Sequence, residues 1–177
     1  MKQIIELTIN GEARELAVEP NRSLLDTLRT EAGLTGTKKG CDVGECGSCT
    51  VLMNGHPVNA CLVLALEARG ADITTVEGIQ PSPDEVHQLQ EQFMQCGAAQ
   101  CGFCTPGIVV MAKALLDVNP QPSTQEIRMA IAGNICRCTG YTKIVEAIGK
   151  TAAACRAQRA DAAAQVPHAT PRIVEQA

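Results

Sequence analysis

The residues of this chain best suited to chemistry are eight of its ten cysteines, which fall into two groups. The first group lies in one short loop and is completed by a later thiol; its members are Cys41, Cys46, Cys49 and Cys61. Four, two and eleven residues separate successive members. This spacing is a ligand pattern for a [2Fe–2S] cluster. The glycines Gly40, Gly44 and Gly47 would let the loop bend closely around such a cluster.

The second group also contains four cysteines, but at a different spacing. Its members are Cys101, Cys104, Cys136 and Cys138, which two, thirty-one and one residues separate. Iron–sulfur ligation requires soft, deprotonated thiolates held at fixed spacing. Two clusters on one chain would mean that electrons pass through the protein.

Zinc is the main alternative metal, because four thiol ligands without a histidine also suit a tetrahedral zinc ion. Structural zinc sites usually use two similar Cys-x2-Cys pairs, whereas Cys136 and Cys138 have a single residue between them. A [4Fe–4S] cluster is disfavoured because the run Cys-x2-Cys-x2-Cys is missing. The zinc alternative would make the protein a metal-stabilised interaction module.

A disulfide framework is a further reading of an even number of cysteines. The closely grouped, glycine-flanked thiols and the alternating residues from Met1 to Glu6, which do not resemble a secretion signal, oppose it. We therefore expect reduced thiols and a cytoplasmic protein.

Charge and composition exclude two classes of partner. The formal net charge is −4, and each oxidised cluster would add about two negative charges. Such a chain repels phosphate backbones, and its aromatic residues are only Phe93, Phe103 and Tyr141, so we expect no nucleic-acid binding. The longest apolar run, 108–116, is too short to span a membrane.

The elements around the first group predict a small α+β domain over residues 1–78. Residues 3–9 alternate in polarity and lead through Asn10-Gly11 into a second strand at 13–18. Ser23 and Asp26 resemble a capping box, with Leu24, Leu25 and Leu28 as the buried stripe of a helix that ends near Gly33. Further strands are expected at 50–53, 56–59 and 72–76. We predict a β-grasp, plant-type ferredoxin-like fold.

Helix signals dominate after a linker at 78–83 and predict a four-helix bundle-like domain over residues 79–155. The expected helices cover 82–95, 105–117, 123–133 and 142–155. Two of them begin beside the second cysteine group, where helix N-termini would stabilise an anionic cluster. The Ala- and Pro-containing tail, 156–177, is expected to be flexible or to wrap a partner.

Three long motifs carry a resemblance to a known family. They are GTKKGCDVGECGSCTV at 36–51, QCGFCTPG at 100–107 and GNICRCTGY at 133–141. In this order they resemble the small iron–sulfur subunit of the xanthine oxidase family of molybdenum hydroxylases. The resemblance covers about residues 4–154.

The resemblance implies an electron-transfer subunit of a heteromeric oxidoreductase. A large subunit would hold a molybdopterin cofactor, and a flavin (FAD) subunit or a cytochrome would accept the electrons. The cluster on the second cysteine group would lie nearer the molybdenum. Gln100 and Cys138 would approach the pterin, although Gln100 could instead be a buried core amide.

Two other functions stay open: a free-standing ferredoxin-like carrier, and the metal-stabilised interaction module that zinc would imply. The roles of several residues are also open. Cys96 and Cys155 are expected to be small buried hydrophobes, and the three histidines, His56, His87 and His168, to be surface residues. Lys38 and Lys39 would either offset the charge of the first cluster or be a solvated pair. Ser48 could donate a hydrogen bond to a sulfur.

Overall fold

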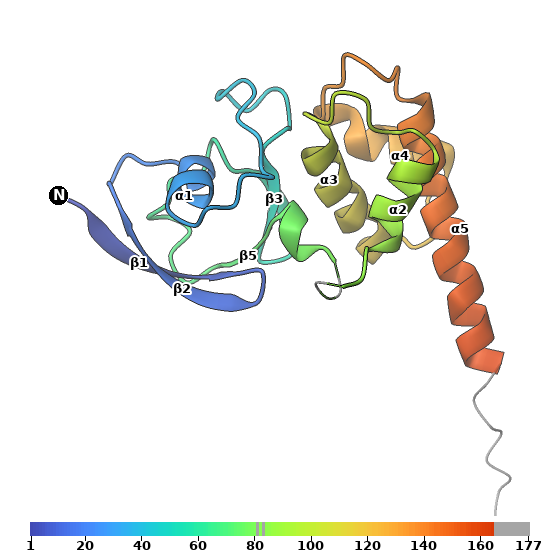
Figure 1. Ribbon diagram of the computed structural model, residues 1–177, viewed down its shortest axis with the longest axis horizontal. Helices are drawn as coiled ribbons and strands as arrows, with labels where there is room; N and C mark the ends of the chain where they lie inside the picture. Colours follow the sequence, from blue (N-terminus) through green and yellow to red (C-terminus); the bar gives the residue numbers. More distant parts are fainter. Residues whose placement is uncertain (81, 83, 165–177) are drawn as a thin grey trace, which may run out of the picture.

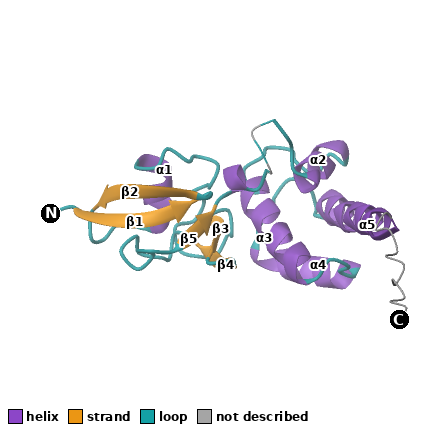
Figure 2. Cartoon of the chain, turned by 90° about the horizontal axis from the view of Figure 1, so that it is seen from below, coloured by secondary structure: helices purple, strands orange, loops and turns teal. Residues whose placement is uncertain are grey.

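The chain folds into a strand-rich half followed by a helix-rich half, which lie side by side (Figure 1, Figure 2). The computed structural model describes residues 1–80, 82 and 84–164. The predicted α+β class is confirmed, with a ferredoxin-like part first and a helical part second.

A five-stranded mixed sheet forms the first half. Its strands are β1 (Gln3–Ile9), β2 (Glu12–Val18), β3 (Thr50–Met53), β4 (His56–Asn59) and β5 (Asp72–Thr74). Their order is β2-β1-β5-β3-β4; β1 and β5 are parallel and the other neighbours are antiparallel. β5 ends two residues before the expected end, because Val76–Gly78 forms a short 3-10 helix, η1.

Both predicted hairpins have the expected turn. Asn10 and Gly11 have positive φ angles of 53° and 82°, and Asn54 and Gly55 have 52° and 79°. Two consecutive left-handed residues match the twist of the flanking strands, and Asn-Gly adopts this conformation at little cost. The turns fix the register, in which Ile9 pairs with Glu12.

One face of the sheet and one helix enclose the first core. The alternating residues Ile5, Leu7 and Ile9 are at most 2% exposed. Helix α1 (Leu24–Thr30) buries its three leucines completely, as the sequence pattern predicts. The Ser23 side chain caps the helix by accepting from the Asp26 N–H at 3.1 Å, but Asp26 binds Lys39 instead of completing a capping box.

Over residues 82 and 84–164, four α-helices form the described part of the second half. They are α2 (Gln88–Gln95), α3 (Thr105–Val118), α4 (Thr124–Ala130) and α5 (Thr142–Ala164). A 3-10 turn, η2 (Ile131–Gly133), follows α4. The Ser123–Glu126 capping box of α4 is confirmed, because each side chain bonds to the backbone of the other residue.

Two helix boundaries differ from the prediction by more than three residues. α2 begins at Gln88 and not at residue 82, because the half-buried His87 supplies the cap: its Nδ1 accepts from the Leu89 N–H at 3.1 Å. The prediction that His87 is a surface residue was therefore wrong. α5 continues to Ala164, nine residues beyond its predicted end, and alanine, the strongest helix former, is frequent there. Residues 165–177 of the predicted tail lie outside the described part of the chain.

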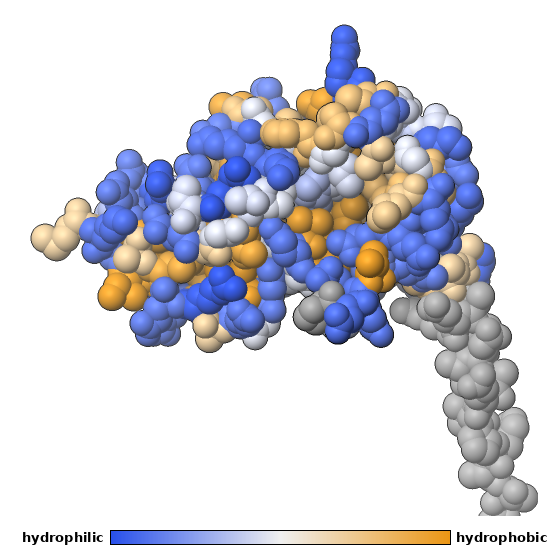
Figure 3. Space-filling view, in the orientation of Figure 1, coloured by the Kyte–Doolittle hydropathy of each residue, from blue (hydrophilic) through white to orange (hydrophobic). Residues whose placement is uncertain are grey.

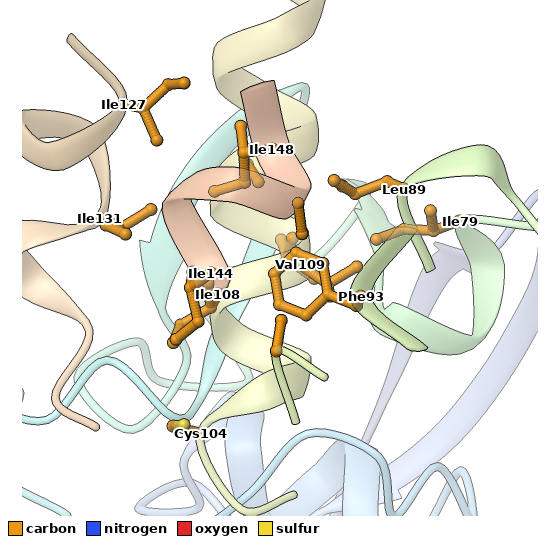
Figure 4. Packing of buried hydrophobic residues seen from close by; sticks show 14 of the residues in the cluster. Ile79, Leu89, Phe93, Cys104, Ile108, Val109, Ile127, Ile131, Ile144 and Ile148 are labelled. Atoms are coloured by element: carbon orange, nitrogen blue, oxygen red, sulfur yellow. The ribbon is translucent and has the colours of Figure 1, made fainter. Parts of the chain in front are cut away.

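A second hydrophobic core lies between the helices (Figure 4). Phe93, Ile108, Ile144 and Ile148 are at most 2% exposed and come from three different helices. Leu52 of β3 also belongs to this cluster, so the sheet contributes to the helical core. The core therefore places α3 against β3.

The molecular surface is mostly polar, with apolar side chains in scattered patches on the face that Figure 3 shows. Within the described residues, every helix is too short or too polar to cross a membrane.

Candidate metal centres

The first cysteine loop connects α1 to β3 and curls around the thiol of Cys41. Asp42, Gly44 and Gly47 have left-handed backbones, with φ angles of 61°, 80° and 66°. The curl points three N–H groups at Cys41 Sγ, from Val43 at 3.5 Å, Glu45 at 3.3 Å and Cys46 at 3.4 Å. Such concave arrays of N–H groups bind anions. The N–H groups of Val43 and Cys46 lower the pKa of the Cys41 thiol to about 7.

The four thiols of the first group meet as two neighbouring pairs. Cys41 contacts Cys46, and Cys49 contacts Cys61. Cys61 reaches the loop because the N–H of Ala60 donates to the carbonyl oxygen of Cys49 at 3.3 Å. Burial raises the pKa of the Cys49 thiol to about 12, so this thiol would ionise only on binding a metal.

The second group is also arranged as two pairs, at the start of two helices. Cys101 and Cys138 are exposed and their Sγ atoms are 3.6 Å apart. Cys104 directly precedes α3 and contacts Cys136. Burial raises the pKa of Cys104 to about 12.

The paired thiols fit a two-iron cluster. A [2Fe–2S] cluster is held by four cysteine thiolates, two on each iron, whereas structural zinc needs four ligands around one ion. Within residues 1–80, 82 and 84–164, no three Cys, His, Asp or Glu side chains form a group suited to a single ion. Each group instead consists of two neighbouring pairs of thiols. All ten cysteines are free thiols.

Gln100 lies at the surface next to the exposed pair of the second group. Its side chain is exposed, so the alternative reading of a buried core amide was wrong for this chain. Gln100, Cys101 and Cys138 thus lie on the outer side of the second loop, open to a partner.

Hydrogen bonds connect the two cysteine loops directly. The N–H of Ile135 donates to the carbonyl oxygen of Cys46 at 2.9 Å. Asn134, only 3% exposed, donates through Nδ2 to the carbonyl oxygen of Gly47 at 2.8 Å and to Thr50 Oγ1 at 3.3 Å. At Gly107 of α3 an added Cβ would overlap the carbonyl oxygen of Gly47. The backbones of the two halves therefore touch at the predicted ligands.

The structural roles of two residues, one at this contact and one behind it, were not predicted from the sequence. Asn134 and Tyr141 lie within the third motif, but no local pattern indicates a partner 87 residues away for Asn134. The one feature of the sequence that could have pointed to a structural role for Tyr141 is its position beside Gly140, at the end of a tight loop before a helix. Its hydroxyl bonds to the backbone of both Asn134 and Cys136.

The remaining cysteines lie apart from the two quartets. Cys96 is buried, as expected, whereas Cys155 is only partly buried and its thiol donates to Gln88 Oε1 at 3.1 Å. His56 is exposed, and His168 lies outside the described residues.

The two lysines that precede the first loop interact with carboxylate and carbonyl oxygen atoms nearby. Lys39 pairs with Asp26 and Asp42 at 3.1 and 2.9 Å, and Lys38 donates to the Thr35 carbonyl oxygen at 2.8 Å. Ser48 is buried between the loop and α3.

Models of two domain families match the chain and together cover both halves. Residues 7–73 match a 2Fe-2S iron-sulfur cluster binding domain, and residues 75–149 match a [2Fe-2S] binding domain. The fold and the sites therefore define an iron–sulfur protein with two [2Fe–2S]-binding domains.

Individual relatives narrow this class to one family. The nicotinate dehydrogenase small FeS subunit of Eubacterium barkeri is 52% identical over 147 residues, which cover 83% of this chain and 93% of that protein. Quinoline 2-oxidoreductase from Pseudomonas putida 86 has a chain of the same fold, with a TM-score of 0.85 and 47% identity over 89% of this chain and 97% of that one. The aldehyde oxidoreductase of Megalodesulfovibrio gigas is 45% identical over 150 residues, 83% of this chain but only 16% of that protein. This chain belongs to the iron–sulfur subunits of the xanthine oxidase family of molybdenum-dependent oxidoreductases.

Proposed function

We propose that this chain relays single electrons from a molybdopterin centre on a large partner subunit to a flavin subunit or a cytochrome. The observation that carries the proposal is the hydrogen bond from Ile135 to Cys46, which brings the two candidate ligand loops into backbone contact. A relay requires two redox centres held close together, and this contact supplies that proximity.

The chain's own residues would hold the two clusters. Cys41, Cys46, Cys49 and Cys61 would bind one cluster in a domain of residues 1–78. Cys101, Cys104, Cys136 and Cys138 would bind the other in a domain of residues 79–155. Each cluster, when bound, takes up and releases one electron. The N–H groups around Cys41 would stabilise the negative charge of the first site.

The exposed side of the second loop would face the molybdopterin subunit. Gln100 and Cys138 are both exposed in the isolated chain and would contact the pterin there. The much longer aldehyde oxidoreductase of M. gigas, of which this chain matches 16%, supports a large partner next to an iron–sulfur part. The first loop, on the other half of the molecule, would then face the electron acceptor.

Metal analysis and EPR spectroscopy test the proposal. The anaerobically purified chain is expected to contain about four iron atoms, and its reduced form to give two distinct S = 1/2 signals. Zinc without a reducible signal would contradict the proposal and support an interaction module.

Co-purification tests the partner. We expect the chain to purify with a large molybdopterin-containing subunit. A monomer that carries both clusters but never binds such a subunit would support the alternative of a free-standing carrier.

A further inference from the structure

Tyr141 has a backbone conformation that is unusual for its side chain. Its φ angle is 67°, in the left-handed region that glycine and asparagine tolerate but bulky residues avoid. Such residues persist only where surrounding contacts hold them, and they gather at functional sites. The contacts of Tyr141 therefore indicate what its conformation serves.

The Tyr141 hydroxyl uses both its donor and its acceptor on the second cysteine loop. It donates to the carbonyl oxygen of Asn134 at 3.0 Å and accepts from the N–H of Cys136 at 2.8 Å. The backbone N–H of Tyr141 donates to Thr139 Oγ1, which lies 3.1 Å from Cys136 Sγ. One side chain thus binds the backbone on both sides of Ile135.

Two residues of the segment 134–136, which Tyr141 holds at both ends, contact the first loop. Ile135 donates to the carbonyl oxygen of Cys46, and Asn134 donates to that of Gly47. Both loops lie at the upper end of the molecule in Figure 1. Hydrogen bonds at both ends of the segment 134–136 therefore connect the Tyr141 hydroxyl, through this segment, to the ligand loop of the other half.

We propose that the Tyr141 hydroxyl is a positioning group that sets the geometry between the two cluster sites. It holds the Cys136 backbone so that this N–H donates to the phenol oxygen. It also fixes the backbone of residues 134–136 in the position from which Ile135 and Asn134 donate to the carbonyl oxygens of Cys46 and Gly47. This inference rests on the proposed function, since it assigns a role in the relay to a residue that binds no iron.

The first test removes only the hydroxyl, by Tyr141→Phe in the full chain with its clusters. We expect iron content to be retained, the EPR signal and midpoint potential of one cluster to shift, and the spin–spin interaction between the clusters to weaken. The shift arises because the freed Cys136 N–H can turn towards a cluster sulfur, and such hydrogen bonds tune the potential. Unchanged signals, potentials and interaction would overturn the inference.

Thr151→Val is the matched control. This buried hydroxyl lies on α5, the helix that follows Tyr141, and donates to the Ala147 carbonyl oxygen at 2.9 Å, within the same helix. Its loss removes a hydrogen bond of similar length without touching either loop. An equal effect of the two variants on the potentials would mean a general loss of stability and would overturn the positioning role.

A second test avoids the risk that Tyr141→Phe fails to fold. Tyr141 is the only tyrosine of the chain, so fluorotyrosine supplied during expression labels this hydroxyl alone. Ring fluorination makes the phenol a stronger donor and a weaker acceptor while keeping its shape. We expect the midpoint potential of one cluster to shift progressively with the number of fluorine atoms, and a constant potential would overturn the inference. A wild-type chain without iron would instead overturn the proposed function and this inference with it.

Discussion

The N–H of Ile135 donates to the carbonyl oxygen of Cys46 at 2.9 Å, although 88 residues separate the two along the chain. Cys46 is a candidate ligand in the first loop, and Ile135 is bonded directly to Cys136, a candidate ligand in the second. The bond therefore joins the two sites by a short path of backbone atoms. The first three predictions test this contact and the two sites, and the fourth tests a helix cap away from them.

Removing the Asn134 side chain should weaken the contact between the halves. Asn134→Ala deletes the bonds to Gly47 and Thr50 in a buried position, and we expect it to lower the free energy of unfolding by about 1–3 kcal/mol. Chemical unfolding measures this loss. Hydrogen exchange at the Ile135 N–H should also become faster, because its partner loop is less well held.

Asn59→Ala is the control for that variant, since Asn59 Nδ2 donates to the Gly44 carbonyl oxygen at 2.9 Å within the first half. It should leave exchange at Ile135 unchanged. Equal exchange rates in the two variants would argue against a specific role of Asn134 in the contact.

Replacement by alanine should change the stability of the protein in opposite directions at two helical glycines. A Cβ at Gly107 would overlap the Gly47 carbonyl oxygen and come within 3.1 Å of Ser48 Cα, so Gly107→Ala should destabilise the protein. Gly149 of α5 has its nearest neighbour, Ile127 Cδ1, at 3.9 Å, and Gly149→Ala should stabilise by about 0.5–1 kcal/mol. Thermal unfolding of both variants provides the measurement. A Gly107→Ala protein as stable as wild type would mean that the halves do not pack this closely in solution.

Replacing one ligand should abolish one cluster only. Cys46→Ser is expected to remove the EPR signal of the ferredoxin-like site and about half of the iron, because the helical site has its own four thiols. Cys155→Ser is the control, since Cys155 belongs to neither group and serine can also donate to Gln88. If both signals disappeared in Cys46→Ser, the two sites would have to assemble as one unit.

The His87 cap should make stability depend on pH. Burial, and then the positive charge of Lys113, lower the pKa of His87, while Asp117 acts in the opposite direction. Because the folded-state pKa lies below that of the unfolded chain, about 6.5, the cap's contribution is complete above that pH. It is lost as the pH falls through the folded-state value, and protonation also removes the Nδ1 acceptor for Leu89.

His87→Asn and His87→Ala separate the two parts of this prediction. Asparagine keeps a capping oxygen, so it should preserve stability at pH 8 and abolish the pH dependence that His87 causes. Alanine should cost about 1 kcal/mol at pH 8. Thermal unfolding between pH 5 and pH 8 decides, and identical profiles for wild type and both variants would show that His87 does not cap α2.

Much of the fold could be predicted from local patterns. The alternation from Gln3 to Ile9, the two Asn-Gly turns and the Ser123–Glu126 box each act within a few residues, so their structure follows from their sequence. The start of α2 could not be predicted in this way. A serine and a proline at 82–83 favoured an earlier helix start, whereas the packing of Leu89 into the helical core favours the start at Gln88.

The sequence by itself determined the family, the two [2Fe–2S]-binding domains and two sets of four thiols, because ligand spacing is a local property of the chain. Only the tertiary structure decided how the sets face each other. Two features of that arrangement depend on shape across the contact between the halves: the bond from Ile135 to Cys46 and the fit of Gly107 against Gly47. They join residues tens of positions apart, and the physical reason that no spacing rule reveals them is that backbone groups of any residue type can make such contacts once packing brings them together.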